Sequence, residues 1–122
     1  MQVFYNHSGD IEGYLIEKLI LNKKARQVMG IILGDIVYGR NGEPVGKFLQ
    51  HVIYNTDGYK VARLSEDSIF TSVNNYMNLI RDEGWDIIKH ITNHYAHWLR
   101  LKEEWSPQQL EEILTQAETA VV

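Results

Sequence analysis

Hydrophobic and polar positions in the first seventy residues follow a repeat of 16 or 17 residues. Each repeat opens with β-branched and aromatic residues, passes through a small polar segment and returns to apolar residues. The residues that open the repeats are Tyr5, Leu21, Tyr38 and Tyr54, with Phe70 at the next interval. A fixed period indicates a repeated supersecondary unit that cannot bury its apolar face alone.

Each repeat is predicted to form a strand, a tight turn and a returning strand. Segments 3–5, 36–38 and 52–54 consist of valine, isoleucine, phenylalanine and tyrosine, a composition typical of half-buried strands. Three repeats continue with short hairpin signals: Ser8 and Gly9, Asn41 and Gly42, and Asp57 and Gly58. Because glycine adopts positive φ at little cost, these pairs predict two-residue turns.

Glycine recurs four residues after the turn, at Gly13 and Gly46, inside the predicted returning strand. A glycine there indicates a bulge or the close approach of another backbone. Pro44 lacks an N–H group, so we expect its strand at a sheet edge or with a bend. The second repeat has no turn glycine and is one residue longer, which predicts a longer and more exposed connection.

After Phe70 the apolar period changes to three and four residues, which is typical of a helix. Apolar residues keep this spacing as far as Leu101, so we expect one helix from residue 72 to residue 104, about 50 Å long at 1.5 Å per residue. Gly84 indicates a kink or a closely packed backbone. A helix of this length exceeds the β unit, so we expect it to pack partly on a second copy of the chain in a homo-oligomer.

A second, shorter helix is predicted to follow, with Ser106 as N-cap, Pro107 at the first helical position and Gln109 closing a capping box. The expected fold class is therefore α+β. A four-repeat antiparallel β unit occupies residues 1–70, and a helical segment at 71–122 packs on it and on other subunits.

Composition and charge exclude several classes of protein. The 122 residues contain no cysteine, which excludes disulfide frameworks and cysteine metal sites. The net charge is −4, and all of it falls after residue 67, so we expect no binding to nucleic acid, which needs a basic face. There is no apolar run of about 18–20 residues and no secretory leader, so we expect an intracellular protein without membrane contact.

Catalytic motifs are absent from the sequence, and we expect neither enzymatic activity nor a cofactor. The glycine pairs lie in hairpins and do not open helices, unlike phosphate-binding loops. One alternative is a metal-dependent enzyme, because His90 and His94 share a helical face, with His97 one step further round and Asp86 as a further ligand. Exposed or interface histidines are the plainer interpretation.

Binding of a small anionic ligand fits the sequence better. Arg81, Asn93 and Arg100 lie off the apolar stripe of the predicted helix, close to Trp85 and other aromatic residues. Aromatic faces stack on nucleobases, and arginine binds two phosphate oxygens at once. The plainer interpretation assigns these aromatic residues to the core or to an interface.

A second candidate anion site lies in the second repeat, where Lys23, Lys24 and Arg26 place three cations in four positions. Such a cluster could meet a phosphate, although a solvated loop is the plainer interpretation of a short basic run.

The repeated motif resembles the four-fold β-flower domain. It consists of tyrosine, then asparagine or glycine, two further residues and glycine, with a second glycine four residues on, and two helices follow the repeats. The resemblance covers residues 1–70, with a degenerate second repeat and Ala62 in place of the last glycine. It implies four short β units around a pseudo-fourfold axis, and little about function.

The layout also resembles the phage Thoeris anti-defence family of signalling-nucleotide sponges. This resemblance implies a homo-oligomer in the bacterial cytoplasm that sequesters a cyclic ADP-ribose isomer, or another cyclic nucleotide, without cleaving it. Arg81 and Arg100 would then bind pyrophosphate, Trp85 or Tyr76 would stack on adenine, and Asn93 would contact the ribose or base. The alternative is a β-flower interaction module that binds no small molecule. The sequence does not separate the two functions, because both need the same apolar stripe.

Overall fold

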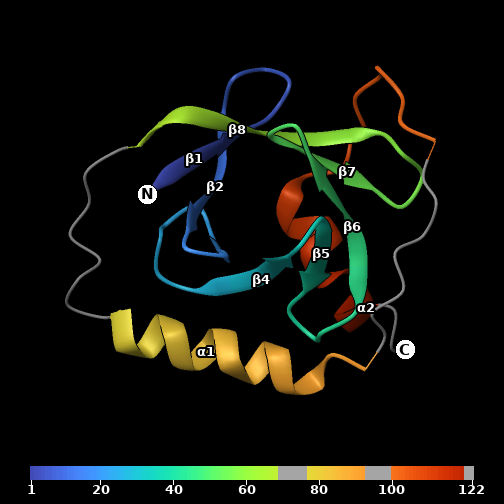
Figure 1. The fold of residues 1–122 in the computed structure, drawn as a ribbon. Coiled ribbons are helices and arrows are strands. Elements are labelled where there is room, and N and C mark those ends of the chain that lie inside the picture. Colours follow the sequence, from blue (N-terminus) through green and yellow to red (C-terminus); the bar gives the residue numbers. More distant parts are fainter. Residues whose placement is uncertain (69–76, 93–99, 120–122) are drawn as a thin grey trace.

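Eight antiparallel strands form a closed barrel in which each strand pairs with the next and β8 pairs with β1 (Figure 1). The computed structural model describes residues 1–68, 77–92 and 100–119. The strands are β1 (Gln2–Tyr5), β2 (Ile11–Ile16), β3 (Leu19–Leu21), β4 (Val28–Leu33), β5 (Ile36–Gly39), β6 (Pro44–Leu49), β7 (Val52–Asn55) and β8 (Lys60–Ser68). The helices are α1 (Met77–His90) and α2 (Leu110–Thr119).

The strand register confirms the predicted four-fold repeat. In each repeat, the residue that follows the second glycine position pairs with the first residue of the next repeat. The pairs are Tyr14 with Leu21, Ile31 with Tyr38, Lys47 with Tyr54, and Arg63 with Tyr5. The last pair joins the fourth repeat to the first, so the same register closes the barrel.

The loops within the repeats differ from the prediction in length. In the first repeat the Asn6 amide donates to the Asp10 carbonyl at 2.9 Å and the Gly9 amide to the Asn6 carbonyl at 3.0 Å, which leaves a three-residue loop. Gly9 has φ of 85°, so the predicted positive φ is confirmed. The prediction of two-residue turns here is wrong, because the left-handed glycine forms a bulge that adds one residue. Two-residue turns join successive repeats instead, at residues 17–18, 34–35 and 50–51.

The second repeat confirms the predicted longer connection. The Asn22 amide donates to the carbonyl of Gln27, five residues on, and Ala25 takes the place of the turn glycine with φ of 57°. The Asn22 side-chain oxygen accepts from the Arg26 amide at 3.1 Å and supports the loop. Lys23 and the other basic residues of this loop are exposed.

Glycines in the returning strands lie against the backbone of the neighbouring repeat, as predicted. A Cβ atom on Gly13 would stand 2.5 Å from the Leu21 carbonyl oxygen, and one on Gly46 would overlap the Tyr54 carbonyl. Pro44 is the first residue of β6 and lies beside a register shift. The closed barrel shows that the edge position suggested by proline is wrong. In place of the predicted bend, the structure shows an irregular register beside Pro44.

Helix α1 covers the outside of the barrel against β4 (Figure 1). It buries Ile80, Gly84 and Ile87, as the apolar spacing predicted. The predicted extent to residue 104 is wrong, because residues 91–92 and 100–105 lie outside any helix. The 14 residues of α1 span about 21 Å, so helix length no longer argues for an oligomer. The predicted helical residues 72–76 and 93–99 lie outside the described residues.

The segment 102–106 is extended because its backbone forms hydrogen bonds with the fourth repeat. The Lys102 amide donates to the Gly58 carbonyl at 3.0 Å, the Lys60 amide to Glu104 at 3.0 Å, and the Ser106 amide to Lys60 at 2.8 Å. A helix would turn these donors and acceptors toward one another, so the tertiary hydrogen bonds override the helical pattern.

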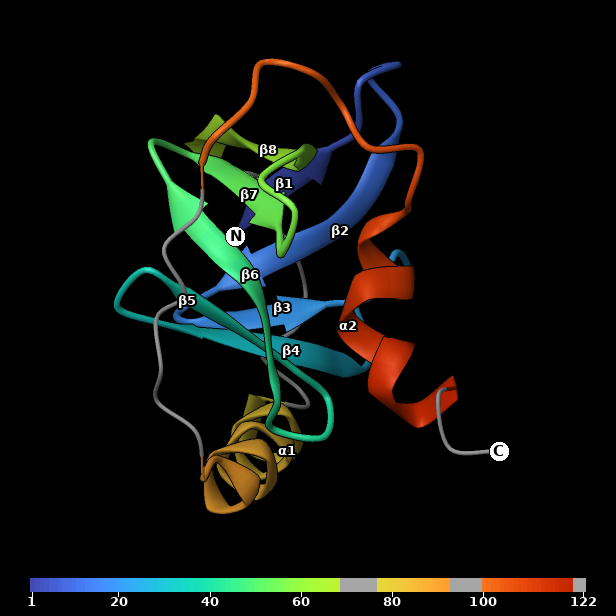
Figure 2. The ribbon, with the colours of Figure 1, turned by 90° about the vertical axis from the view of Figure 1, so that its right-hand side faces the viewer.

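Helix α2 closes one end of the barrel (Figure 2). Its Leu110, Ile113 and Leu114 join the interior side chains of the strands in one buried cluster. The predicted start at Pro107 is wrong by three residues, because Ser106 Oγ accepts from the Gln108 amide in a separate turn before the helix. Neither α1 nor α2 has the length and apolar character that a bilayer span requires.

Candidate functional site

A hollow of about 330 Å³ lies between α1 and the strands beneath it. Gly84 lines it and lets the helix approach β3, since a Cβ atom there would stand 2.6 Å from Leu19 Cδ2. The prediction of a kink or a closely packed backbone at Gly84 is therefore wrong: the neighbour is the Leu19 side chain, and α1 passes through this position without interruption.

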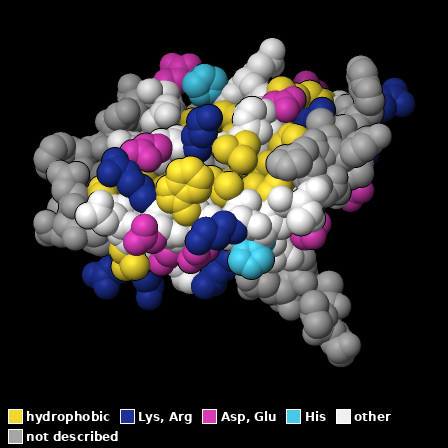
Figure 3. All heavy atoms as spheres, turned by 60° about the horizontal axis from the view of Figure 1, so that its bottom comes forward, with side chains coloured by type: hydrophobic (Ala, Val, Ile, Leu, Met, Phe, Trp, Pro, Cys, Tyr) yellow, Lys and Arg dark blue, Asp and Glu magenta, His cyan; other side chains and the backbone are white. Residues whose placement is uncertain are grey.

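The floor of the hollow is apolar and its rim is charged. The floor is formed by Leu19, Ile31, Leu33, Gly84 and Ile88, and the rim by Glu17, Lys18, Arg81 and Trp85. On this side of the molecule hydrophobic side chains form a patch surrounded by basic and acidic groups (Figure 3). Ligand sites commonly combine an apolar surface with a few placed polar groups, and their volumes begin at about 300 Å³.

Arg81 and Glu17 form an ion pair at the rim. Arg81 Nη2 donates to Glu17 Oε1 at 2.8 Å, and both side chains are about half exposed, at 52% and 50%. The hydrogen bond that Arg81 donates to Glu17, together with the negative charge of that carboxylate, raises the pKa of the Arg81 guanidinium. Arg81 comes from α1 and Glu17 from the turn between β2 and β3, so the pair connects the two walls of the hollow.

Trp85 follows Arg81 by one helical turn, so both side chains leave α1 on the same face. Its side chain is 61% exposed although it lines the hollow. A large exposed aromatic side chain beside an apolar depression is typical of a recognition surface. Since Arg81 and Trp85 line one hollow, two of the predicted ligand-binding residues lie together.

The other predicted residues of this site lie elsewhere. Arg100 is exposed and lies just before the extended segment, and its carbonyl lies against Gly58 in the fourth repeat. It is absent from the residues that line the hollow, so the structure does not bring it to Arg81. Tyr76 and Asn93 lie outside the described residues.

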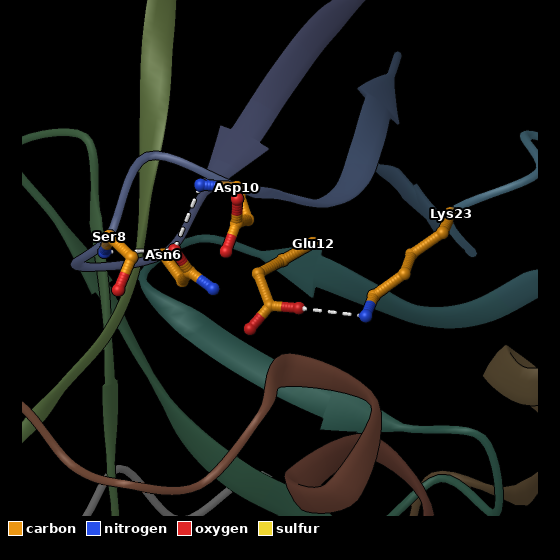
Figure 4. Close-up of polar contacts among 5 residues, drawn as sticks. All are labelled: Asn6, Ser8, Asp10, Glu12 and Lys23. Atoms are coloured by element: carbon orange, nitrogen blue, oxygen red, sulfur yellow. Dashed lines mark hydrogen bonds and ion pairs between the residues drawn. The ribbon is translucent and has the colours of Figure 1, made fainter.

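In the second candidate anion site, one cation is already paired. Lys23 Nζ lies 3.4 Å from Glu12 Oε2, and the Glu12 side chain is only 2% exposed. Figure 4 shows Lys23 reaching toward Glu12 on β2. Lys24 and Arg26 remain exposed on the same loop, so this loop has two exposed cations outside the pair.

Glu12 is buried, which the sequence analysis did not predict. The alignment of the repeats indicates this burial, because Met29, Val45 and Val61 occupy the same position in the other three repeats and all three are buried. A carboxylate at a position that is otherwise apolar and buried needs a cationic partner, and Lys23 of the second repeat is that partner.

Of the three histidines in the metal-site hypothesis, the structure describes only His90. His90 Nδ1 lies 2.6 Å from the Asp86 carbonyl oxygen, so that nitrogen carries a proton and donates. His90 and Asp86 line a smaller hollow of about 200 Å³ with Arg40 and Glu83. Within residues 1–68, 77–92 and 100–119, no three histidine or acidic side chains stand close enough to hold a metal ion. His94 and His97 lie outside these ranges.

Comparison with known proteins assigns the fold to a family. The model of the family described as "4-fold beta flower protein" matches residues 2–114. Searches of curated proteins and of solved structures find no match. The match spans the four repeats, α1 and the first half of α2, and the closed barrel has the four-fold register that this name describes. The chain therefore belongs to the 4-fold beta flower protein family.

Proposed function

We propose that this protein binds and sequesters a cyclic ADP-ribose-type signalling nucleotide, without cleaving it, and so blocks Thoeris immunity in the cytoplasm of a bacterial host. The observation that carries this proposal is the placement of Arg81 and Trp85 at the rim of one apolar hollow. The resemblance to the phage anti-defence sponges suggests the ligand, and the hollow offers groups that suit it.

Each side chain at the hollow would act on one part of such a ligand. The exposed indole of Trp85 would stack on adenine, an interaction worth about 1–3 kcal/mol per base. The Arg81 guanidinium would bind two oxygens of the pyrophosphate. Lys18 adds a second cation at the rim, and Leu19 and Ile31 offer an apolar floor for the base edge or ribose.

The size of the hollow supports a site that is completed by other groups. A volume of about 330 Å³ is near the lower limit for ligand sites, and it suits a base better than a whole cyclic dinucleotide. We propose that the remainder of the ligand extends over the rim toward a second copy of the chain in a homo-oligomer, and that Tyr76, Asn93 and Arg100 remain candidates for contacts there.

Calorimetric titration with cyclic ADP-ribose isomers and cyclic dinucleotides tests the proposal. The bound ligand is then released by heat and analysed by chromatography. We expect tight binding by the wild type, recovery of intact ligand, and at least tenfold weaker binding by Arg81→Ala and Trp85→Ala. Arg63→Ala and Leu79→Ala, which remove exposed side chains away from the hollow, serve as matched controls and should bind as the wild type does.

A second candidate function is that of an interaction module without a small ligand. Leu79 and Trp85 on α1 are 58% and 61% exposed, and exposed large apolar side chains are typical of protein contact sites. In that case no nucleotide would release heat on titration. Light scattering would then show a loss of oligomer mass in a variant that carries both Leu79→Ala and Trp85→Ala.

A further inference from the structure

The ion pair between Glu17 and Arg81 occupies the position in which the proposed function places a phosphate. A carboxylate and a phosphate present oxygens of similar geometry to a guanidinium, and both can accept two of its N–H groups. At 2.8 Å from Arg81 Nη2, Glu17 Oε1 already takes one of these donors. An anionic ligand that takes the same Nη2 donor must therefore replace Glu17.

Glu17 opens a tight turn between β2 and β3. Glu17 has φ of 57°, a left-handed conformation that favours glycine. The first residues of the other two inter-repeat turns, Gly34 and Gln50, have φ of 63° and 50°. Positive φ at this place is therefore a property of the turn, and the ion pair with Arg81 is what distinguishes Glu17.

The surroundings of the pair allow the exchange. Both side chains are half exposed, so the ion pair is weakly held and can open without unfolding of the turn or the helix. Lys18, next to Glu17 at the rim, remains as a second cation beside the freed carboxylate.

We propose that Glu17 is an internal competitor that holds Arg81 across the hollow and lowers the affinity of the site for anions. This inference rests on the proposed function in that the ligand is an anion bound by Arg81. Opening the ion pair costs the same free energy whichever anion then binds Arg81, so Glu17 lowers the affinity for all of these anions by about the same factor.

The test compares the wild type with Glu17→Gln, which keeps the side-chain size, and Glu17→Gly, which also relieves the positive φ. Inorganic pyrophosphate, citrate and cyclic ADP-ribose are titrated at constant ionic strength. Nuclear magnetic resonance of the Arg81 side-chain Nε–H reports binding at this residue. Asp82→Asn, an exposed neighbour outside the hollow with the same change in net charge, is the matched control.

We expect Glu17→Gln and Glu17→Gly to bind pyrophosphate about two to five times more tightly than the wild type, the gain that loss of an exposed ion pair allows. Citrate bound at Arg81 should gain by a similar factor, and Asp82→Asn should bind pyrophosphate as the wild type does. Equal or weaker pyrophosphate binding by both Glu17 variants overturns the inference, and so does an equal gain in Asp82→Asn.

The same experiment separates this inference from the proposed function. If pyrophosphate follows the expected order and cyclic ADP-ribose binds none of the proteins, the competitor role of Glu17 stands and the proposed ligand is wrong. If cyclic ADP-ribose binds the wild type and neither Glu17 variant binds more tightly, the proposed function stands and Glu17 is no competitor.

Discussion

Lys23 and Glu12 form an ion pair between the second repeat and the first, with lysine Nζ 3.4 Å from a carboxylate that is almost fully buried. The other repeats place Val45, Val61 and Met29 at the position of Glu12. The pair is therefore a local departure from the repeat, in which a buried carboxylate is paired with an exposed lysine.

We expect Lys23→Ala to lower the free energy of unfolding by about 1–3 kcal/mol, because it leaves a buried carboxylate without its cation. Glu12→Val should be neutral or stabilising, because it restores the apolar residue found in the third and fourth repeats. Urea unfolding followed by tryptophan fluorescence measures both changes. Lys24→Ala is the control and should stay within about 0.5 kcal/mol of the wild type. A greater loss in Glu12→Val than in Lys23→Ala would refute this account of the pair.

Substitutions at two equivalent loop positions should change the stability of the protein in opposite directions. Ala25 and Gly9 both have positive φ, at 57° and 85°. A side chain in the left-handed region costs about 1–2 kcal/mol. Ala25→Gly should therefore stabilise the protein by roughly 0.5–1 kcal/mol after the entropy cost of glycine, and Gly9→Ala should destabilise it by about 1 kcal/mol. Thermal unfolding of the two variants checks the signs, and a shift in the same direction would contradict the assigned loop geometry.

Stability at high pH should depend on Tyr38, which is 1% exposed. Burial raises the pKa of its phenol above 10.0. The unfolded chain therefore loses this proton at a lower pH than the folded chain does. The contribution of Tyr38 is fully present below pH 10 and falls as the pH rises, by up to about 1.4 kcal/mol per pH unit.

Urea unfolding between pH 8 and pH 11 tests this expectation. Tyr38→Phe should lose less stability above pH 10 than the wild type, whatever its stability at neutral pH. Tyr5→Phe, which removes a half-buried phenol from the first repeat, shows what the loss of any one phenol does. Parallel pH profiles for the wild type and Tyr38→Phe would show that Tyr38 does not contribute.

Gly84 connects the packing of α1 with the hollow. Gly84→Ala gains helix propensity of about 1 kcal/mol, but the new methyl group would meet Leu19 Cδ2 at 2.6 Å, and overpacking costs about 1–3 kcal/mol. We expect a net loss of up to about 2 kcal/mol by urea unfolding, together with weaker nucleotide binding because Leu19 must move within the hollow. If the Gly84→Ala variant binds the nucleotide with wild-type affinity, Leu19 and Gly84 do not belong to the site.

The sequence predicted the β unit well because its signals are local. Strand composition, turn glycine and period act within 16 or 17 residues, so Tyr5, Tyr38 and Tyr54 could be aligned without tertiary information. The length of α1 could not be predicted in this way. Residues 102–106 have hydrogen-bond partners near Gly58 and Lys60, more than forty residues earlier, and no local pattern reports that pairing.

The part of the candidate site that lies within one helix could be predicted, and the contacts between residues distant in sequence could not. Arg81 and Trp85 are four residues apart on a helix, so the sequence places them on one face. Glu17 could not be found, because its ion pair with Arg81 spans 64 residues of sequence. The combination of Arg81 with Arg100 required a continuous helix between them, and the helix ends at His90.

The most direct test of the central claim is the location of a bound nucleotide by intermolecular nuclear Overhauser effects. With cyclic ADP-ribose present, we predict contacts between adenine protons and the Trp85 indole, assigned with the variant Trp85→Phe, and a shift of the Arg81 Nε–H signal. Adenine contacts confined to other residues, with the Trp85 and Arg81 signals unchanged, would contradict a nucleotide site in the α1 hollow.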